Sequence, residues 1–154
     1  MDKCGFGGFS IETMTAERLE EYVDVFINVF TKEPWNDVYE SRGQVRRFFE
    51  NYMADSYFLG FSLERGGACA GLCFGARKPW LGGMEYWIDQ FCVAEEFQRR
   101  GVGTLFLALV EKEAERLGLN GIMLATARGF PSEKFYLKNG FLRLDDTVLL
   151  VKQR

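Results

Sequence analysis

The sequence predicts a mixed α/β domain, and three observations carry this prediction. Apolar strand-like runs alternate with amphipathic helical patterns along the 154 residues, and no linker, repeat or low-complexity segment interrupts them. Hydrophobic residues make up 47% of the chain, including 15 Phe. A chain of this length and composition can bury a core large enough to fold alone. We therefore expect one domain over residues 1–154.

The first third of the chain predicts one strand and two helices. Alternation in Phe9–Met14 indicates the strand, and Thr15 is a suitable N-cap for the first helix. Apolar residues then recur at three- and four-residue steps until Pro34 ends the pattern. A second helix is expected from Ser41, because Gln44 is spaced to complete a capping box.

Strands dominate the middle of the chain and helices return after it. The expected strands cover residues 57–64, 68–76, 84–93 and 121–127. The first two of these form a hairpin through the Arg65-Gly66-Gly67 turn. One helix runs from Val102 to Gly118 and a shorter one from Pro131 to Gly140. Residues 140–154 predict one or two final strands.

Composition excludes several classes of function. The chain has no histidine, which removes His-based triads and His metal sites. Cys69 and Cys73 lack the short-loop spacing of a zinc knuckle, so we expect Cys4, Cys92 and these two residues to be core thiols, with no metal site. The formal net charge of −3 argues against a nucleic-acid partner.

No membrane association is expected. The segment after Met1 lacks a basic start followed by a long apolar run, and no apolar run approaches the roughly 20 residues that cross a bilayer. We expect a soluble cytoplasmic protein. Residues 1–75 carry 7 Lys/Arg against 12 Asp/Glu, and residues 76–154 carry 12 against 10. An anionic ligand therefore prefers the second half of the chain, and a cationic ligand prefers the first.

The stretch VAEEFQRRGVGTLFLALVEK places two arginines and two glycines between an apolar strand and a helix. Glycine admits a ligand close to the backbone, and unpaired amides at a helix start attract anions. The dinucleotide fingerprint is excluded because Phe106 replaces its third glycine, and a phosphate loop is excluded because no lysine follows Gly103. What remains is Gln-x-x-Gly-x-Gly, from Gln98 to Gly103.

A second motif, FYLKNGF, follows on the expected short helix and includes Tyr136, Lys138 and Gly140. With both motifs in this order of elements, the chain resembles the GNAT superfamily of acetyl-coenzyme A dependent N-acetyltransferases over nearly its whole length. The resemblance implies a single GNAT-like α/β (α+β) domain. Its central sheet would be mixed and mostly antiparallel, splayed between strands 4 and 5 and flanked by about four helices.

The resemblance implies that acetyl-coenzyme A binds at the glycine motif. The residues expected to contact it are Phe91, Cys92, Val93, Gln98, Arg99, Arg100, Gly101, Val102, Gly103, Thr104 and Lys138. Helix-start amides and arginines suit a pyrophosphate, and the Cys92 and Val93 backbone would pair with the pantetheine and polarise the acetyl carbonyl. Many members carry an asparagine before the last short helix, where this chain has Gly129.

The resemblance also implies a role for Tyr136, whose hydroxyl would protonate the departing thiolate as a general acid. An amine acceptor must lose a proton before it attacks, and Glu85, Asp89 or water remains open as the base. Cys92 as an acylated nucleophile is less favoured, because no histidine activates it and the strand context buries it.

The segment EPWNDVY lies where the family builds its variable substrate wall. Trp35 would either stack on the acceptor or anchor the loop after Pro34, and Asp37 would meet the ammonium group of the acceptor. The acceptor remains open among a small amine, an aminoglycoside-like sugar and a protein amino group, and a homodimer is plausible. The alternatives are a non-catalytic acyl-CoA-binding regulatory module of the same fold and an acidic interaction domain, which explains neither motif.

Overall fold

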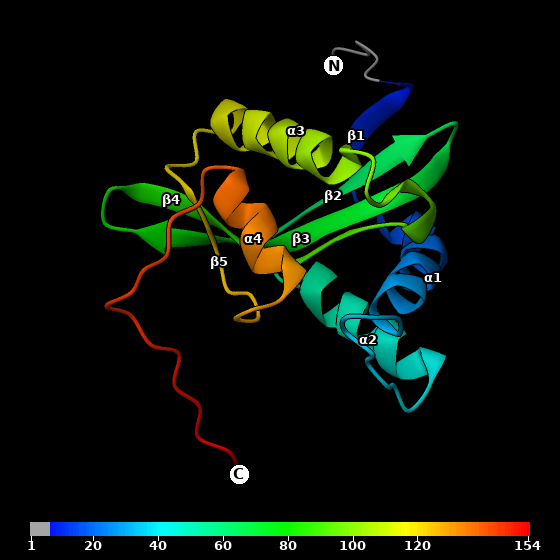
Figure 1. Ribbon diagram of the computed structural model, residues 1–154, viewed down its shortest axis with the longest axis horizontal. Coiled ribbons are helices and arrows are strands. Elements are labelled where there is room, and N and C mark those ends of the chain that lie inside the picture. The colour runs from blue at the N-terminus through cyan, green and yellow to red at the C-terminus, as the bar shows by residue number, and fades with distance from the viewer. Residues whose placement is uncertain (1–6) are drawn as a thin grey trace.

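In the computed structural model, which describes residues 7–154, a five-stranded sheet separates two layers of helices (Figure 1). The strands, in spatial order, are β1 (Phe9–Thr13), β2 (Phe58–Arg65), β3 (Ala68–Trp80), β4 (Gly83–Val93) and β5 (Ile122–Leu124). The pairs from β1 to β4 are antiparallel and β5 is parallel to β4. The predicted mixed, mostly antiparallel sheet is therefore confirmed.

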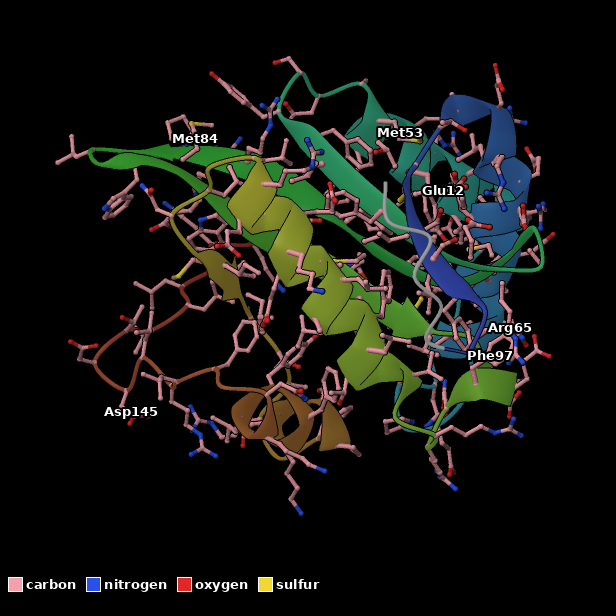
Figure 2. The ribbon with its side chains drawn as sticks, turned by 90° about the horizontal axis from the view of Figure 1, so that it is seen from above. Glu12, Met53, Arg65, Met84, Phe97 and Asp145 are labelled. Carbon is pink, nitrogen blue, oxygen red and sulfur yellow. The ribbon has the colours of Figure 1, made fainter. Side chains whose placement is uncertain are left out.

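Four α-helices lie within the described residues, as predicted. They are α1 (Leu19–Phe30), α2 (Arg42–Met53), α3 (Val102–Arg116) and α4 (Pro131–Lys138), with short 3-10 turns η1 (Ala16–Arg18) and η2 (Glu95–Phe97). α1 and α2 pack on one face of the sheet, in a core that includes Phe26, Phe49 and Phe74. α3 covers the other face with Phe106 and Val110, as Figure 2 shows from above.

The helix starts follow the capping chemistry only in part. The Ser41 hydroxyl accepts a hydrogen bond from the Gln44 amide at 3.1 Å, which confirms the predicted cap of α2. The Gln44 side chain accepts from the Glu40 amide rather than from Ser41. Thr15 does not cap α1, because η1 intervenes and the Thr15 amide donates to the Tyr22 hydroxyl at 3.1 Å.

The β3–β4 hairpin is longer than expected. Its ladder continues to the pair Trp80↔Gly83, so the hairpin forms an arm that extends beyond the helices (Figure 1). The sequence missed this extension because Arg77, Lys78 and Pro79 break the apolar pattern. Backbone pairing holds the arm together with the Lys78–Trp87 contact at 4.3 Å and the Asn120 side chain, which donates to the Gly82 carbonyl at 2.9 Å.

The prediction of final strands in residues 140–154 is wrong for the single chain. No strand follows α4 in the described residues, and β5 is also shorter than expected. Phe141 packs on the Tyr136 ring at 5.4 Å between centroids, and Arg143 donates to Glu133 at 3.1 Å. The segment then runs away from the sheet (Figure 1), so its strand-forming residues have no partner strand among residues 7–154.

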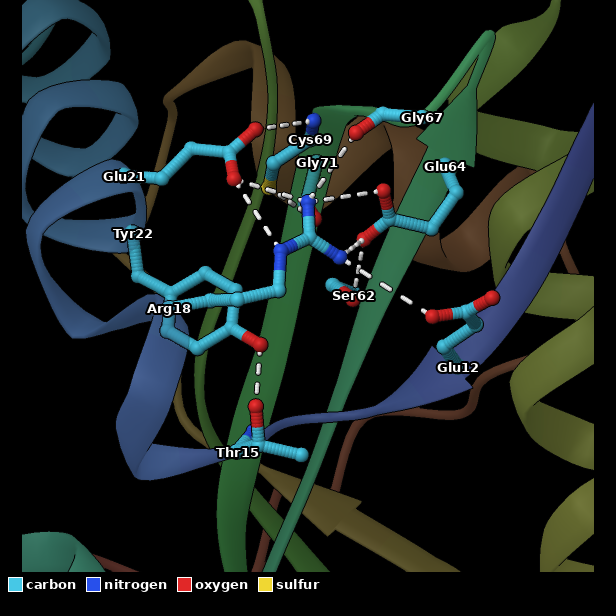
Figure 3. Close-up of polar contacts among 10 residues, drawn as sticks. All are labelled: Glu12, Thr15, Arg18, Glu21, Tyr22, Ser62, Glu64, Gly67, Cys69 and Gly71. Atoms are coloured by element: carbon cyan, nitrogen blue, oxygen red, sulfur yellow. Dashed lines mark hydrogen bonds and ion pairs between the residues drawn. The ribbon is translucent and has the colours of Figure 1, made fainter.

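A buried ion pair ties the start of α1 to the sheet (Figure 3). Glu64 of β2 is only 4% exposed, and both of its oxygens accept from Arg18, at 2.8 and 2.9 Å. The Ser62 hydroxyl also donates to Glu64. Arg18 contacts Glu21 at 2.8 Å, and Glu21 accepts from the Cys69 amide at 2.7 Å. These partners compensate the burial of the Glu64 charge.

Candidate active site

The candidate site begins where β4 and β5 separate. β5 pairs with β4 only from Tyr86 to Ile88, whereas β4 continues to Val93. In the described part of the chain, the edge of β4 beyond Ile88 therefore has no neighbouring strand on the β5 side. This is the predicted splay. Its consequence is that alternate backbone groups of β4 are free to pair with an extended ligand.

A β-bulge at Asp89 produces this separation. The ladder with β3 shifts between Phe74↔Gln90 and Gly75↔Ile88, which leaves Asp89 as the extra residue. A Cβ atom on Gly75 would lie 1.9 Å from the Trp87 carbonyl oxygen, so only glycine fits there. The sequence analysis missed this role, although a glycine inside a strand is the available signal for a bulge.

Unpaired amides face outward at the start of α3. Arg99 and Gly101 have φ angles of 62° and 78°, and the first intrahelical bond runs from the Leu105 amide to the Gly101 carbonyl at 3.1 Å. Among the described residues, the Val102, Gly103 and Thr104 amides donate no hydrogen bond to a protein acceptor. Successive amides in this arrangement, added to the helix dipole, form an anion-binding concavity.

Three residues that were predicted to contact the coenzyme instead make contacts within the protein that support this concavity. The Gln98 side chain donates to the Val93 carbonyl at 2.9 Å and so holds the loop against the end of β4. Val102 is buried in the core under α3. A Cβ on Gly103 would lie 3.3 Å from the Phe135 ring, so this glycine lets α3 and α4 approach. Its role in packing was not foreseen.

Other predicted contacts stand at the surface of the site. Arg99, Arg100 and Thr104 are exposed around the α3 amides, and Lys138 is exposed at the end of α4. Their side chains are therefore free to meet an anionic ligand, and the arginines add charge to the amides.

Tyr136 lies beside the free stretch of β4. Its ring contacts Phe91 of β4 at 6.2 Å and Phe135 at 5.2 Å between centroids, and Phe91 also stacks on Phe106 at 5.1 Å. Burial raises the pKa of Tyr136 above its ordinary value, so the phenol stays protonated at neutral pH. Within the described residues, the Tyr136 hydroxyl donates to no protein acceptor, and it is not fully enclosed away from solvent.

The two candidate bases on β4, Glu85 and Asp89, lie at different distances from the site. Asp89 is exposed at the bulge and accepts a hydrogen bond from the Tyr52 hydroxyl at 3.0 Å. Glu85 lies opposite Lys78 in the hairpin arm, about 13 Å along the strand from Asp89. Asp89 is thus the carboxylate next to the site, two residues before Phe91.

Two tyrosines were missed by the sequence analysis. Neither Tyr52, which lies in the helix expected from Ser41, nor Tyr39 was singled out. Each donates its hydroxyl to a predicted site residue: Tyr52 to Asp89, and Tyr39 to Asp37 at 3.1 Å. Burial, followed by the bonded carboxylate, raises the pKa of both phenols. Helical periodicity gave no signal for either contact, because Tyr52 and Asp89 lie on different elements and Tyr39 and Asp37 lie in the loop before α2.

The loop between α1 and α2 borders the end of β4. Trp35 packs between Phe30 and Phe130, with ring centroids at 5.7 and 5.2 Å, so it anchors the loop to the residue before α4. Lys32 forms an ion pair with Glu95 of η2. Asp37 lines a surface pocket together with Ile27, Thr31, Val38, Tyr39, Ser41 and Arg42. The loop is therefore fixed both to η2, which follows β4, and to the residue before α4.

The cysteines do not form a second reactive centre. Cys69, Cys73 and Cys92 are free and buried, as predicted, and Cys4 lies outside the described residues. Burial raises the pKa of Cys73 to about 12 and that of Cys92 further still, so neither is a thiolate near neutral pH. Residues 7–154 contain no cluster of potential metal ligands, and none of their helices has the length and apolar composition of a membrane span.

Comparison with known families agrees with this architecture. The family described as Acetyltransferase (GNAT) family matches residues 15–141, which include the splayed strands, the α3 amides and Tyr136. The chain belongs to the GNAT family of acetyltransferases, and it is an acyltransferase. A comparison with curated protein sequences found no match.

Solved structures share the fold at low identity. A transcriptional regulator from Bacillus halodurans C-125 is similar at a TM-score of 0.74 and 18% identity, covering 94% of this chain and 99% of its own. AAC(6')-Iy in complex with the bisubstrate analog CoA-S-monomethyl-acetylneamine is similar at a TM-score of 0.69 and 16% identity, covering 95% of this chain and 98% of its own. The third is the aminoglycoside acetyltransferase meta-AAC0020 from an uncultured soil metagenomic sample, in complex with sisomicin. It is similar at a TM-score of 0.73 and 12% identity, covering 96% of this chain and 97% of its own. These likenesses confirm the predicted fold class.

Proposed function

We propose that this protein transfers an acetyl group from acetyl-CoA to a primary amine of a small cationic acceptor, by direct attack while both substrates are bound. The observation that carries the proposal is the convergence of three features: the free edge of β4, the unpaired amides of α3 and the protonated Tyr136. Family membership supports acetyl transfer to an amine in general, and the AAC(6')-Iy complex supports an acyl-CoA donor.

The donor fits the residues around the splay. The amides of Val102 to Thr104, with Arg99 and Arg100, would hold its pyrophosphate by charge-assisted hydrogen bonds. The open edge of β4 would pair with the pantetheine amides, and a backbone N–H near Cys92 would donate to the acetyl carbonyl oxygen. A donor aimed at the developing oxyanion contributes about 3 kcal/mol to transition-state stabilisation.

Tyr136 would act as the general acid. The acceptor nitrogen attacks the thioester carbon, the carbon–sulfur bond breaks, and the leaving sulfur takes the Tyr136 proton. The raised pKa of Tyr136 supports this role because it keeps the phenol protonated, and its hydroxyl has no protein acceptor among the described residues. The phenolate regains a proton from solvent or from the acetylated amine.

Asp89 is the base that the geometry favours over Glu85 and water. Its carboxylate lies at the bulge beside the free stretch of β4, and the Tyr52 hydroxyl fixes its orientation at 3.0 Å. Glu85 belongs to the hairpin arm, farther from Phe91 and Tyr136. An ammonium acceptor would lose its proton to Asp89, directly or through one water.

The acceptor wall combines aromatic and acidic groups. Trp35 and Phe130 present adjoining rings, while Asp37 of the α1–α2 loop and Asp89 of β4 supply negative charge. Such a wall favours an amine with more than one positive charge. The sisomicin complex of meta-AAC0020 supports a small-molecule acceptor of this type over a protein amino group.

Thermal unfolding with acetyl-CoA, beside matched samples with NAD and ATP, tests donor binding first. We expect saturable stabilisation by acetyl-CoA alone, followed by thiol release that depends on an added amine. The Tyr136→Phe variant should keep the thermal shift while kcat falls at least about 10-fold, toward the general-acid range of about 10²–10⁴.

Other outcomes identify the competing functions. Acetyl-CoA binding without amine-dependent thiol release by any polyamine or aminoglycoside would indicate a regulatory module that binds the coenzyme. No shift at acetyl-CoA concentrations well above about 1 mM would contradict the donor site itself.

A further inference from the structure

We propose that the ring of Trp87 is a subsite for a second ammonium group of the acceptor, and that Lys78 occupies this subsite in the free protein. The inference rests on the proposed acetyl transfer, in which the reacting amine lies at Asp89. It narrows the acceptor to amines whose second positive charge lies about 7 Å from the reacting nitrogen, the distance that two strand residues span.

Trp87 lies on the same face of the sheet as the candidate base. Tyr86 and Ile88, its neighbours in β4, belong to the core beneath α3, so the Trp87 side chain points to the opposite face. That face carries α1 and α2, and there the Tyr52 hydroxyl of α2 reaches Asp89 at 3.0 Å. The indole is therefore two residues along the strand from the carboxylate that would receive the proton of the reacting amine.

The Trp87 ring already binds a cation. The Lys78 ammonium lies over it, 4.3 Å from the ring centroid. Glu85 is directly opposite Lys78 in the hairpin, yet the two form no ion pair among the described residues. An ammonium group is attracted to the negative face of an aromatic ring, and Trp is the strongest partner of this kind. The structure thus contains a cation site that holds a cation of the chain itself.

Lys78 can leave the ring more easily than the ring can move. The Lys78 side chain is exposed, and its ammonium is strongly hydrated once it enters solvent. Trp87 is half-buried, and its indole nitrogen is enclosed without a hydrogen-bond acceptor in the described residues. An enclosed, unpaired N–H costs stability, and departures of this kind concentrate at functional sites. We therefore expect a ligand ammonium to displace Lys78 from a fixed ring.

Two carboxylates flank the ring along β4. Glu85 lies two residues before Trp87 and Asp89 lies two residues after it, so alternation directs all three to one face of the strand. A monoamine at Asp89 would leave the ring and Glu85 unused. An amine with a second ammonium group would reach the ring and Glu85 as well, and these two groups would contribute to binding and not to proton transfer.

Steady-state kinetics with matched amines tests the subsite. The amines 1,4-diaminobutane and 1,5-diaminopentane carry a second ammonium group at the required separation, whereas butylamine carries none. Trp87→Leu should raise KM for the diamines about 3- to 30-fold, the range of a cation–π contact, and should leave kcat and the KM for butylamine within about 2-fold. Lys78→Met keeps an apolar stem on the ring and should lower the diamine KM about 3-fold or more.

Arg77→Met is the matched control for charge. Arg77 adjoins Lys78 in β3, but its guanidinium lies over the Tyr57 ring at 5.8 Å. This variant loses the same charge as Lys78→Met, so it reports any general electrostatic effect on cationic acceptors. We expect the ratio of the diamine KM to the butylamine KM to stay at the wild-type value in Arg77→Met and to fall only in Lys78→Met.

Two-dimensional NMR of the full chain observes binding without turnover. The chain has three tryptophans, and the indole N–H signal that is absent from Trp87→Phe, a variant that keeps a ring, belongs to Trp87. We expect this signal to shift saturably as 1,4-diaminobutane is added to the wild type and to stay in place with butylamine.

The outcomes separate the subsite from the acetyl transfer on which it rests. A saturable shift of the Trp87 signal without amine-dependent thiol release would support the cation subsite and contradict the proposed function. Amine-dependent thiol release with one KM ratio in the wild type, Lys78→Met and Trp87→Leu would overturn the subsite and leave the acetyl transfer standing. A Trp87 signal that does not move at about 10 mM 1,4-diaminobutane, well above a millimolar Kd, would also overturn it, even where Trp87→Leu fails to fold.

Discussion

At the scale of single residues, the candidate chemistry depends on two tyrosine hydroxyls in different situations. Tyr136 has no protein acceptor in the described part of the chain, whereas Tyr52 donates to Asp89 at 3.0 Å. Burial raises the pKa of both phenols, so both keep their protons. The free hydroxyl is available as an acid, and the bound hydroxyl orients a carboxylate that is available as a base.

This division of roles predicts different effects for the two carboxylates of β4. Asp89→Asn should lower kcat at least about 10-fold, because an amide cannot accept the ammonium proton. Glu85→Gln, the matched control on the same strand, should leave kcat within about 2-fold of the wild type. Steady-state thiol release measures both. A loss of kcat confined to Glu85→Gln would instead identify Glu85, in the hairpin arm, as the general base.

At the scale of secondary-structure elements, the bulge in β4 opens the site. Gly75 of β3 permits it, since the β4 backbone approaches so closely that a Cβ would lie 1.9 Å from the Trp87 carbonyl oxygen. The bulge ends the pairing with β5 and also presents Asp89. One glycine on the neighbouring strand therefore controls both the free edge and the candidate base.

Gly75→Ala should destabilise the fold by about 3 kcal/mol, the upper end for overpacking, because backbone rather than a flexible side chain must move. Coenzyme affinity should fall as well, if the strands close. Urea unfolding and acetyl-CoA titration measure the two effects. Gly82→Ala is the control, because a Cβ there meets only Asn120 at 3.8 Å. Equal stability of the two variants would contradict the assigned role of the bulge.

At the scale of the whole molecule, one ionic network connects η1, α1 and the sheet. Arg18 bridges Glu64 of β2 and Glu21 of α1, and Glu21 also accepts from the β3 residue Cys69 (Figure 3). Burial alone would raise the pKa of Glu21, but the Cys69 amide and the Arg18 guanidinium outweigh it and lower that pKa. The network therefore makes folding sensitive to acid.

The sign of this dependence follows from the lowered pKa. Glu21 contributes stability that is present above its unfolded pKa of about 4.3 and is lost as the pH falls through the lower folded value. We expect Glu21→Gln to be less stable than the wild type at pH 7, and the difference to shrink as the pH falls below the unfolded pKa of about 4.3. Urea midpoints at pH 7, 5 and 3 measure it. Glu17→Gln, at an exposed glutamate of η1, is the control, and a difference independent of pH would refute the linkage.

The sequence by itself determined the elements and the two motifs. Helical periodicity, the Ser41 cap and the glycines at 101 and 103 act over a few residues, so the order of helices and strands and the outward amides of α3 were predictable. Their spacing also predicted the family, which the match over residues 15–141 confirms.

Only the tertiary structure decided which groups meet. It directed the Gln98 side chain to the Val93 carbonyl, joined Tyr52 to Asp89, and placed Asp89 in a bulge that depends on Gly75. It also left the last apolar segment without a partner strand in the part of the chain that the structure describes. Local patterns predict which backbone conformation a segment prefers, whereas its hydrogen-bond and strand partners depend on residues distant in sequence that the fold brings together.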